Sequence, residues 1–325
     1  MKTRHDLREI VPELEYVDKF ILEMFQSRSD NIGSLNSFLG QMKGKKFRSA
    51  LFLTCARMHQ GRDLQSLIPI AASLELIHTA TLLHDDVLDE ARLRRSRPTA
   101  NTLWGNQVAV LLGDYLFSRA FTLLTSFGNL EIIDLMVNTM EEMSVGEIQQ
   151  QLEVSNPDLT EEEYLERIKQ KTAVFMASCC LAGCLICEAS REIKSSVYNY
   201  GLKLGMVYQI IDDVLDFSGK EKNIGKDTCS DLKNGIITLP LIHTLKLSPG
   251  KDDISSWIKE QKLGESEILI IKNEIKLQGG IEYSIKIAER YMNEALTYLE
   301  AIPSEDVQNS LEAISQLVLR KVLIT

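Results

Sequence analysis

Apolar residues recur at intervals of three and four along most of the chain, which is the spacing that places side chains on one face of an α-helix. One such series is Ile281, Ile285, Ala288, Met292 and Ala295. Runs that alternate between apolar and polar residues, as strands do, are scarce. The pattern predicts an all-α protein, with about ten or more helices packed in one bundle.

Turn-forming residues separate the predicted helices. Thr160 and Glu163 have the spacing of a capping box, so a helix is expected to begin there. Polar connections are expected near residues 219–235 and 248–266. Because no linker rich in proline, glycine and serine interrupts the pattern, we expect a single domain over residues 1–325.

Composition and charge narrow the class of protein. With 325 residues, of which 44% are hydrophobic, the chain can bury a large core. Its net charge of -10 argues against a nucleic-acid partner, because such partners bind a basic face. Positive charge is local, in residues 43–48 and 92–97. The first residues lack the apolar core of a signal peptide, so a cytoplasmic location is expected.

Six cysteines could suggest a zinc site, since four of them lie between Cys179 and Cys187. The sixteen residues from Thr172 to Cys187 contain no charged side chain and only one Cys-x-x-Cys pair. This favours reduced cysteines in the core over a zinc site. The same run is the candidate for a membrane span, but it is short of the roughly 20 apolar residues required, which favours a buried central helix.

The motif Asp-Asp-x-x-Asp occurs twice, each time at the end of an apolar run: at Asp85, Asp86 and Asp89, and at Asp212, Asp213 and Asp216. On a helix, the first and last aspartates of each motif share a face, and their repulsion must be neutralised. Mg²⁺ does so, because it prefers carboxylate oxygens supplemented by water and substrate phosphates. We therefore expect both motifs to bind Mg²⁺.

Basic residues lie near the first motif in sequence. Arg94 and Arg95 follow it, and guanidinium groups suit phosphate oxygens. Lys45 and Arg48 could supply a second anion site. One diphosphate held by metal and another held by Lys and Arg side chains is the arrangement that transfer between two diphosphate substrates requires. In that chemistry one diphosphate leaves, an allylic cation forms, and a neighbouring alkene attacks it.

At about residues 40–245 the chain resembles the trans-isoprenyl diphosphate synthases (polyprenyl synthetases), and among them the bacterial octaprenyl diphosphate synthases. The motifs that carry the resemblance are Leu74 to Asp86, Arg94-Arg95-x-x-Pro98-Thr99-Ala100-Asn101, Gly113-Asp114-Tyr115-Leu116, Gly146-Glu147, Lys171-Thr172 and Gln209-x-x-Asp212-Asp213-x-x-Asp216. The resemblance implies the isoprenoid synthase fold, a helical bundle around a central cavity.

The resemblance also implies an activity: Mg²⁺-dependent condensation of isopentenyl diphosphate with an allylic diphosphate of the geranyl or farnesyl type. The product would be a long trans-polyprenyl diphosphate of about octaprenyl length, for quinone side chains. A homodimer is implied, with at most peripheral membrane contact. The site residues that it implies are Asp85, Asp86, Asp89, Asp212, Asp213 and Asp216 around Mg²⁺; Arg94, Lys171 and Lys226 at the allylic diphosphate; Lys45, Arg48, His78 and Arg95 at isopentenyl diphosphate; and Lys171, Thr172 and Gln209 near the developing cation.

Product length is expected to depend on small residues below the first motif. Ala80 lies five residues before Asp85, about 7.5 Å lower along the helix axis. With Thr81 it is expected to line the tunnel for the growing chain. The alternative is that Ala80 is small to let two helices pack closely.

The chain departs from the family pattern at four positions. Lys43 and Ser96 stand where glycine is usual, Ser49 where proline is common, and Ile236 where lysine is frequent. The first three are interpreted as backbone adjustments. Ile236 removes one diphosphate contact but leaves both aspartate motifs intact.

Four other classes compete with this interpretation. A catalytically silent regulatory subunit would be expected to lack motif residues, which this chain keeps. An all-helical metal phosphohydrolase would use His59 and the His84-Asp85 pair, but would not explain the second motif. A ferritin-like site needs two Glu-x-x-His pairs, and the sequence has only Glu75-x-x-His78. A cyclase of the same fold would not need the second anion site.

Overall fold

The computed structural model describes residues 6–26, 38–39, 44–58, 63–94, 96–218 and 229–323. These residues form more than ten α-helices, and their only strands are the two-residue pair β1 (Leu93–Arg94) and β2 (Arg97–Pro98). The predicted all-α class is confirmed. The central cavity stays a prediction.

The structure divides into two compact units. The first comprises residues 1–137, 178–198 and 299–317, and the second comprises residues 138–177, 199–298 and 318–325. The division falls within the helices α8 (Leu130–Leu152), α10 (Val174–Ile186), α11 (Arg191–Ser218) and α18 (Glu305–Leu323). The single domain over residues 1–325 stays a prediction.

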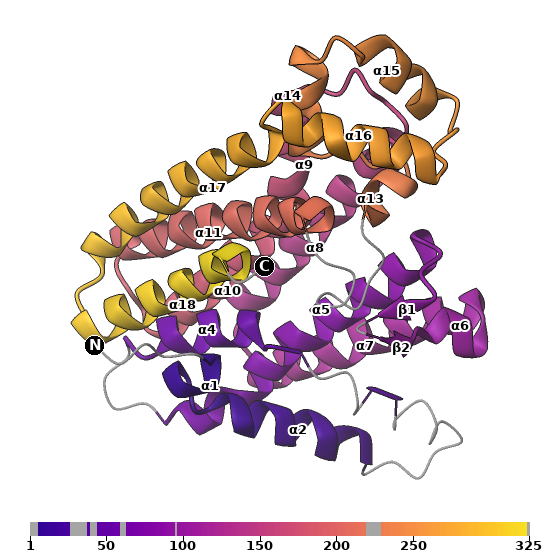
Figure 1. Ribbon diagram of the computed structural model, residues 1–325. Helices are drawn as coiled ribbons and strands as arrows, with labels where there is room; N and C mark the ends of the chain where they lie inside the picture. The colour runs from indigo at the N-terminus through magenta and orange to yellow at the C-terminus, as the bar shows by residue number, and fades with distance from the viewer. Residues whose placement is uncertain are drawn as a thin grey trace. The chain divides into compact units, whose positions relative to one another are not determined.

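The first unit is built on α5 (Ile68–Leu88), a long helix that begins with Pro69 in its first turn and ends in the first aspartate motif. It packs against helices that precede and follow it in the chain (Figure 1). Burial of its apolar face drives this packing. The other helices of this unit are α1 (Leu7–Ile10), α2 (Leu14–Gln26), α4 (Phe47–Ala56), α6 (Ala100–Trp104) and α7 (Asn106–Phe127).

The uncharged run from Thr172 to Cys187 is a buried helix, as predicted, and forms the last residues of a π-helical turn (Lys169–Ala173) followed by α10. Five cysteines are buried and Cys187 is half-buried, which confirms their place in the core. Burial raises the pKa of the Cys179 and Cys180 thiols, so these thiols are protonated at neutral pH.

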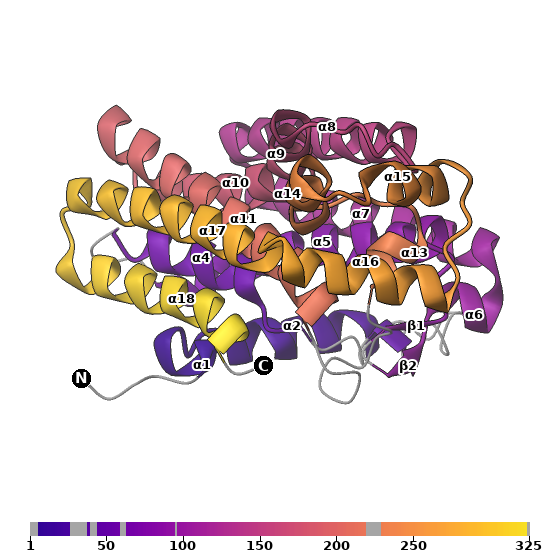
Figure 2. The ribbon, with the colours of Figure 1, turned by 45° about the horizontal axis from the view of Figure 1, so that its top comes forward.

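Within the second unit, α14 (Leu239–Leu247) contacts α9 (Glu161–Ile168), α15 (Lys251–Lys259), α16 (Glu265–Leu277) and α17 (Gly280–Thr297). Figure 2 shows α14, α15 and α16 grouped together. α9 begins with the predicted capping box: the Thr160 side chain accepts from the Glu163 N–H, and the Glu163 carboxylate accepts from the Thr160 N–H. The short helix α13 (Ser230–Lys233) follows α11 after the residues that the structure does not describe.

The predicted polar connection over residues 248–266 is wrong in part, because it contains α15. This nine-residue helix buries only Ile254 and Ile258, an anchor too small to stand out among nearby charged residues. The connection predicted over residues 219–235 lies partly outside the described residues, and its remainder contains α13.

Two helices that the sequence analysis did not single out are long and apolar enough to cross a membrane: Leu64–Leu88 and Asn106–Phe127. In the most apolar window of the first, 67% of the residues are buried inside the protein; in that of the second, 33% are. A core helix of a soluble protein passes the same test, so length and composition alone do not make either helix a membrane span.

Candidate active site

The first aspartate motif lies at the C-terminal end of α5. Asp85 and Asp89 are half-buried, and Asp89 caps the helix, its N–H donating to the Asp85 carbonyl. Asp86 differs from both, because it is only 2% exposed. Its Oδ1 accepts a hydrogen bond of 2.7 Å from Arg94 Nε. The predicted phosphate ligand Arg94 is therefore anchored to the motif itself.

The segment after α5 is tied back to it by Thr99 and Asn101, which belong to a motif that carries the family resemblance. Asn101 Nδ2 donates to the carbonyl oxygens of Asp86 and Ala91, at 3.0 and 3.1 Å. Thr99 Oγ1 donates to the Ala91 carbonyl at 2.7 Å. These bonds hold Arg94 in a short hairpin whose turn contains Ser96 at φ 60°. A left-handed φ explains why glycine is usual at that position.

His84 is packed against α7. Its Nε2 lies 3.1 Å from the Val110 carbonyl oxygen and 3.5 Å from Asp114 Oδ1. A Cβ atom at Gly113 would collide with the imidazole ring, so glycine is needed for this close approach. His84 thus has a packing role that needs no hydrolytic chemistry. His59, its partner in the phosphohydrolase interpretation, lies outside the described residues.

The basic residues before and at the start of α4 differ in how far they are buried. Lys45 is exposed, whereas Lys46 and Arg48 are 6% and 8% exposed. Lys46 takes a left-handed conformation at the N-cap of α4, and its Nζ lies 3.6 Å from Asp18 Oδ1. Of the pair assigned to isopentenyl diphosphate, Lys45 is therefore exposed to solvent and Arg48 is buried.

Ser49 is more than a backbone adjustment. It is the third residue of α4, so its N–H has no carbonyl partner within the helix. That N–H donates to Glu75 Oε1 at 3.2 Å, whereas the hydroxyl donates to the Ala71 carbonyl at 2.7 Å and lies 3.2 Å from Glu75 Oε1. Glu75 is 4% exposed and Ser49 is fully buried. Serine therefore supplies an N–H donor to a buried carboxylate and a hydroxyl donor to the Ala71 carbonyl, neither of which the proline common in the family could supply.

The three aspartates of the second motif have different surroundings. Asp212 is exposed on α11, and Asp213 is 3% exposed. Asp216 accepts from the N–H groups of Ser230 and Asp231, at 3.0 and 3.2 Å, and so holds the start of α13. Of the three, Asp212 is the one whose side chain is exposed to solvent.

Asp213 joins two other predicted site residues in a hydrogen-bonded network. Thr172 Oγ1 donates to Gln209 Oε1 at 2.8 Å, and Gln209 Nε2 donates to Asp213 Oδ1 at 2.8 Å. The hydroxyl of Tyr164 donates to Asp213 Oδ2 at 2.7 Å. Burial raises the pKa of Asp213 to about 7.

Lys171 lies in the π-helical turn, a feature often found at functional sites. Its Nζ lies 2.5 Å from Glu147 Oε2 on α8. A Cβ atom at Gly146 would lie 2.7 Å from the Lys171 N atom, so the close approach of α8 to this turn requires glycine. The Gly146-Glu147 motif therefore positions Lys171.

The remaining predicted residues differ in burial, and two of them lie outside the described residues. Ala80 is fully buried, and Thr81 is half-buried with its hydroxyl bonded to the His78 carbonyl at 2.8 Å. His78 is half-buried. Arg95 and Lys226 lie outside the described residues.

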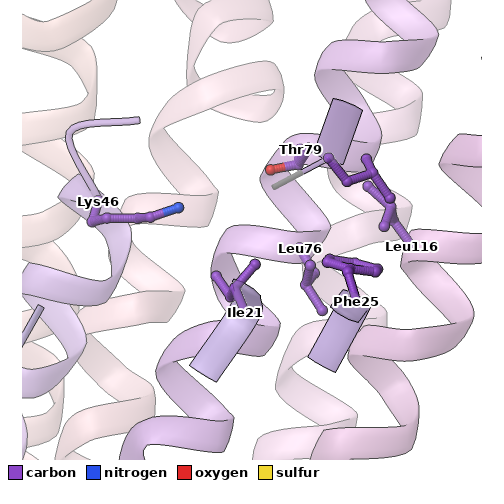
Figure 3. A pocket seen from close by; sticks show the side chains of 7 residues that line it. Ile21, Phe25, Lys46, Leu76, Thr79 and Leu116 are labelled. Atoms are coloured by element: carbon purple, nitrogen blue, oxygen red, sulfur yellow. The ribbon is translucent and has the colours of Figure 1, made fainter. Parts of the chain in front are cut away.

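Figure 3 shows a small cavity in the first unit. Its volume is about 10 Å³, roughly that of one water-sized sphere, which is too small for a prenyl chain. Its walls come from α2, α5, α7 and the residues around α4: Ile21, Phe25, Leu39, Lys46, Leu76, Thr79 and Leu116.

The aspartates of the two motifs suit a metal ion that takes most of its ligands from water and substrate phosphates. Among the described residues, no group of three or more His, Cys, Asp or Glu side chains is placed to hold a metal ion by itself. Mg²⁺ is usually bound through one or two carboxylates, with waters and substrate phosphates completing its octahedron. Asp85 and Asp89 at the end of α5 are a pair of this kind, and Asp212 on α11 is a single exposed carboxylate.

Sequence reasoning missed Tyr164 and Ser230, although both contact the second motif. Tyr164 lies seven residues before Lys171, two helical turns away, and could have been noticed as a polar aromatic residue among the apolar positions of a predicted helix. Ser230 follows the stretch that the structure does not describe, and nothing in its sequence context points to Asp216.

Comparison with known proteins agrees with these motifs. The family model for polyprenyl synthetase matches residues 32–275. The chain is 35% identical over 303 residues to heptaprenyl diphosphate synthase component 2 of Geobacillus stearothermophilus, covering 93% of this chain and 94% of that one. It is 31% identical over 306 residues to octaprenyl diphosphate synthase of Escherichia coli (strain K12), covering 94% of each.

A solved structure resembles this one closely. It is a polyprenyl synthase from Caulobacter crescentus CB15, complexed with calcium and isoprenyl diphosphate. The two structures agree with a TM-score of 0.90 at 29% sequence identity, covering 98% of each chain. From the family match and these relatives, the chain belongs to the polyprenyl synthetase family of prenyltransferases.

Proposed function

We propose that this protein is a Mg²⁺-dependent trans-polyprenyl diphosphate synthase that condenses isopentenyl diphosphate with an allylic diphosphate of the geranyl or farnesyl type. One observation carries the proposal: in each aspartate motif the second aspartate is buried and bound by a protein donor, while its neighbours stay closer to solvent. The protein thus organises each motif around a buried second aspartate.

Mg²⁺ would be held by the aspartates of the two motifs: Asp85, Asp86, Asp89, Asp212, Asp213 and Asp216. When bound, it stabilises the charge of the departing diphosphate. This would account for the presence of intact motifs on two helices, α5 and α11. It is also consistent with the calcium in the Caulobacter crescentus complex, since calcium and magnesium share a preference for oxygen ligands.

The chain's own residues bind the two substrates. Arg94 and Lys171 would hold the allylic diphosphate, together with Lys226. Lys45, Arg48, His78 and Arg95 would hold isopentenyl diphosphate. In the reaction the allylic C–O bond breaks, and diphosphate leaves with the electron pair. A C–C bond forms to the isopentenyl double bond, and the released diphosphate accepts the proton that restores a double bond.

Polar side chains would stabilise the allylic cation between these two steps. Gln209 Oε1 and Thr172 Oγ1 are 2.8 Å apart, and both carry lone pairs. Oxygen atoms held in fixed positions stabilise a developing positive charge without having to reorient during the reaction. We assign this role to both residues.

The product proposed is a long chain of about octaprenyl length, for quinone side chains. Relatives named for heptaprenyl and octaprenyl products support this range. Ala80 and Thr81 are the proposed determinants, because small side chains below the first motif leave room for an elongating chain. A cytoplasmic location, with at most peripheral contact to the membrane that receives the product, completes the proposal.

A homodimer is proposed from exposed apolar residues. Within the first unit, five large apolar side chains of α6, α7 and the start of α8 are exposed: Leu103, Val110, Leu111, Leu130 and Val137. Leu111 is 66% exposed and Leu130 is 78% exposed. A soluble protein gains free energy by covering such a surface with a second copy. Light scattering of Leu111→Glu and Leu130→Glu variants, which should dissociate the dimer, tests this.

Diphosphate release separates the proposed activity from its rivals. Purified protein with Mg²⁺ and both substrates should release diphosphate, and isopentenyl diphosphate alone should yield none. A silent subunit would release none under any condition. A phosphohydrolase would also act on isopentenyl diphosphate, and a cyclase would act on the allylic substrate alone at full rate. Any of these three outcomes would remove the proposal.

A further inference from the structure

Tyr164 is a buried tyrosine that none of the assigned roles uses. It lies on α9, is fully buried, and its hydroxyl donates to Asp213 Oδ2 at 2.7 Å. The guanidinium of Arg167 lies 5.6 Å from the centre of its ring. Arg167 is itself fixed, because it donates to Glu153 at 2.9 Å and to the Ile237 carbonyl at 2.7 Å. The position of the Tyr164 hydroxyl is therefore set by packing on several sides.

Tyr164 donates to one oxygen of the Asp213 carboxylate, and the other oxygen also accepts a hydrogen bond. Gln209 Nε2 donates to Asp213 Oδ1 at 2.8 Å. In its ionised form Asp213 only accepts hydrogen bonds, so the amide nitrogen of Gln209, rather than its oxygen, faces the carboxylate. This leaves Gln209 Oε1 toward Thr172, whose hydroxyl donates to it at 2.8 Å. Asp213 thus determines which way the Gln209 amide points.

Asp213 and its neighbour Asp212 have different surroundings. Asp212 is exposed, whereas both oxygens of Asp213 accept from protein donors in a site that is 3% exposed. Asp213 is therefore held on both oxygens by protein donors in a site nearly closed to solvent, which is not the case for Asp212. The arrangement is that of a carboxylate that orients other side chains.

We propose that Tyr164 is a positioning residue for prenyl transfer: by fixing Asp213 it fixes the Gln209 amide beside Thr172, and Asp213 serves this network rather than binding the metal. The inference rests on the proposed function for the roles of Gln209 and Thr172. It extends that function by naming a residue that acts through others, and it reassigns Asp213 among the six aspartates.

The first test compares Tyr164→Phe with a matched control, Tyr283→Phe. Tyr283 also donates its hydroxyl to a carboxylate, Glu161 at 2.9 Å, but contacts neither motif. Because a misplaced amide is felt mainly in the transition state, Tyr164→Phe should lower kcat about 10- to 100-fold. The KM for each substrate should stay within about threefold, because the interaction that is lost is made in the transition state and not in the ground state. Tyr283→Phe should leave kcat within about twofold.

Two results of that test would overturn the inference. One is that the kcat of Tyr164→Phe equals that of the wild type, in an assay in which the wild-type enzyme is active. The other is a raised KM with an unchanged kcat, since that would indicate a role in substrate binding alone. If the wild-type protein itself releases no diphosphate, the proposed function fails, and the second test decides the reassignment of Asp213.

The second test measures metal binding without turnover. Mn²⁺ is titrated by calorimetry into protein that holds inorganic diphosphate, for Asp213→Asn and Asp212→Asn in parallel. The inference predicts that Asp213→Asn keeps the Mn²⁺ Kd within about threefold of wild type, while Asp212→Asn weakens it at least tenfold. An equal loss in both variants would make Asp213 a ligand and overturn the inference, even if Tyr164→Phe failed to fold.

Discussion

The guanidinium of Arg94 is bound to Asp86, the second aspartate of the motif that it follows in the chain, through a bond of 2.7 Å between Nε and Oδ1. The Asp86 side chain is 3% exposed and that of Arg94 is 22% exposed. One end of the arginine is thus used to orient the residue, so the position of a proposed phosphate ligand depends on a buried carboxylate.

Replacing Arg94 is therefore expected to affect both stability and substrate binding. Arg94→Ala should lower the free energy of unfolding by about 1–3 kcal/mol, because a buried carboxylate loses a charged donor. It should also raise the KM for the allylic diphosphate. The control is Arg92→Ala, an exposed residue of the same segment, expected to change stability by less than about 0.5 kcal/mol. Equal urea unfolding curves for the two variants would contradict the role of the Asp86 bond.

Ser49 offers a test that restores the residue common in the family. Ser49→Pro removes the N–H donor to Glu75 Oε1 and the hydroxyl donor to the Ala71 carbonyl, and should lower the free energy of unfolding by about 1–3 kcal/mol. Ser49→Ala keeps the N–H donor, so its free energy of unfolding should fall between those of Ser49→Pro and the wild type. Urea denaturation measures both. A Ser49→Pro variant more stable than wild type would show that the serine is a neutral replacement, since proline in a first helical turn otherwise tends to stabilise.

His243 should make stability depend on pH. Its ring stacks on Tyr283 with centroids 4.0 Å apart, and burial, followed by the charge of Lys246, lowers its pKa below the usual 6.5. The unfolded chain then binds a proton at this site more readily than the folded protein does. Stability is therefore lost as the pH falls through 6.5.

The measurement for His243 is the free energy of unfolding at pH 7.5 and at pH 5.5, for wild type and His243→Phe. Phenylalanine keeps a ring against Tyr283 but cannot take up a proton. The wild type should lose more stability on acidification than the variant. An identical loss in both proteins would mean that other groups account for the whole pH dependence.

Much of the fold could be predicted from the sequence, because local signals determine it. Apolar periodicity gave the helices, and the Thr160–Glu163 spacing gave the start of α9. Both aspartate motifs end apolar helical runs, as predicted. α15 was missed because two buried isoleucines in a charged segment make a weak periodic signal.

The organisation of the site was harder to predict, because it depends on pairs that are distant in sequence. Tyr164 and Asp213 are 49 residues apart, and Ser49 and Glu75 are 26 residues apart. The sequence assigned all six aspartates alike to metal. Only the folded chain shows that Asp86 and Asp213 are buried and bound by protein donors, while Asp212 is exposed.

Ala80 is the residue with which product length can be tested. If it lines the tunnel, Ala80→Phe should stay folded and active but make markedly shorter products. If it is small only for packing, the same change should cost about 1–3 kcal/mol of stability without altering the product, because Ala80 is fully buried. Thermal melting and product analysis of this variant separate the two. A variant that melts lower but still makes full-length product would refute the tunnel assignment.

The most direct test of the proposed function is mass analysis of the products that purified protein makes from labelled isopentenyl diphosphate and farnesyl diphosphate in the presence of Mg²⁺. We predict a ladder of polyprenyl diphosphates, each one isoprene unit longer than the last, ending in a long chain near octaprenyl, and no products when Mg²⁺ is removed. Products that carry no label, or a farnesyl diphosphate that is only hydrolysed or cyclised, would contradict the account.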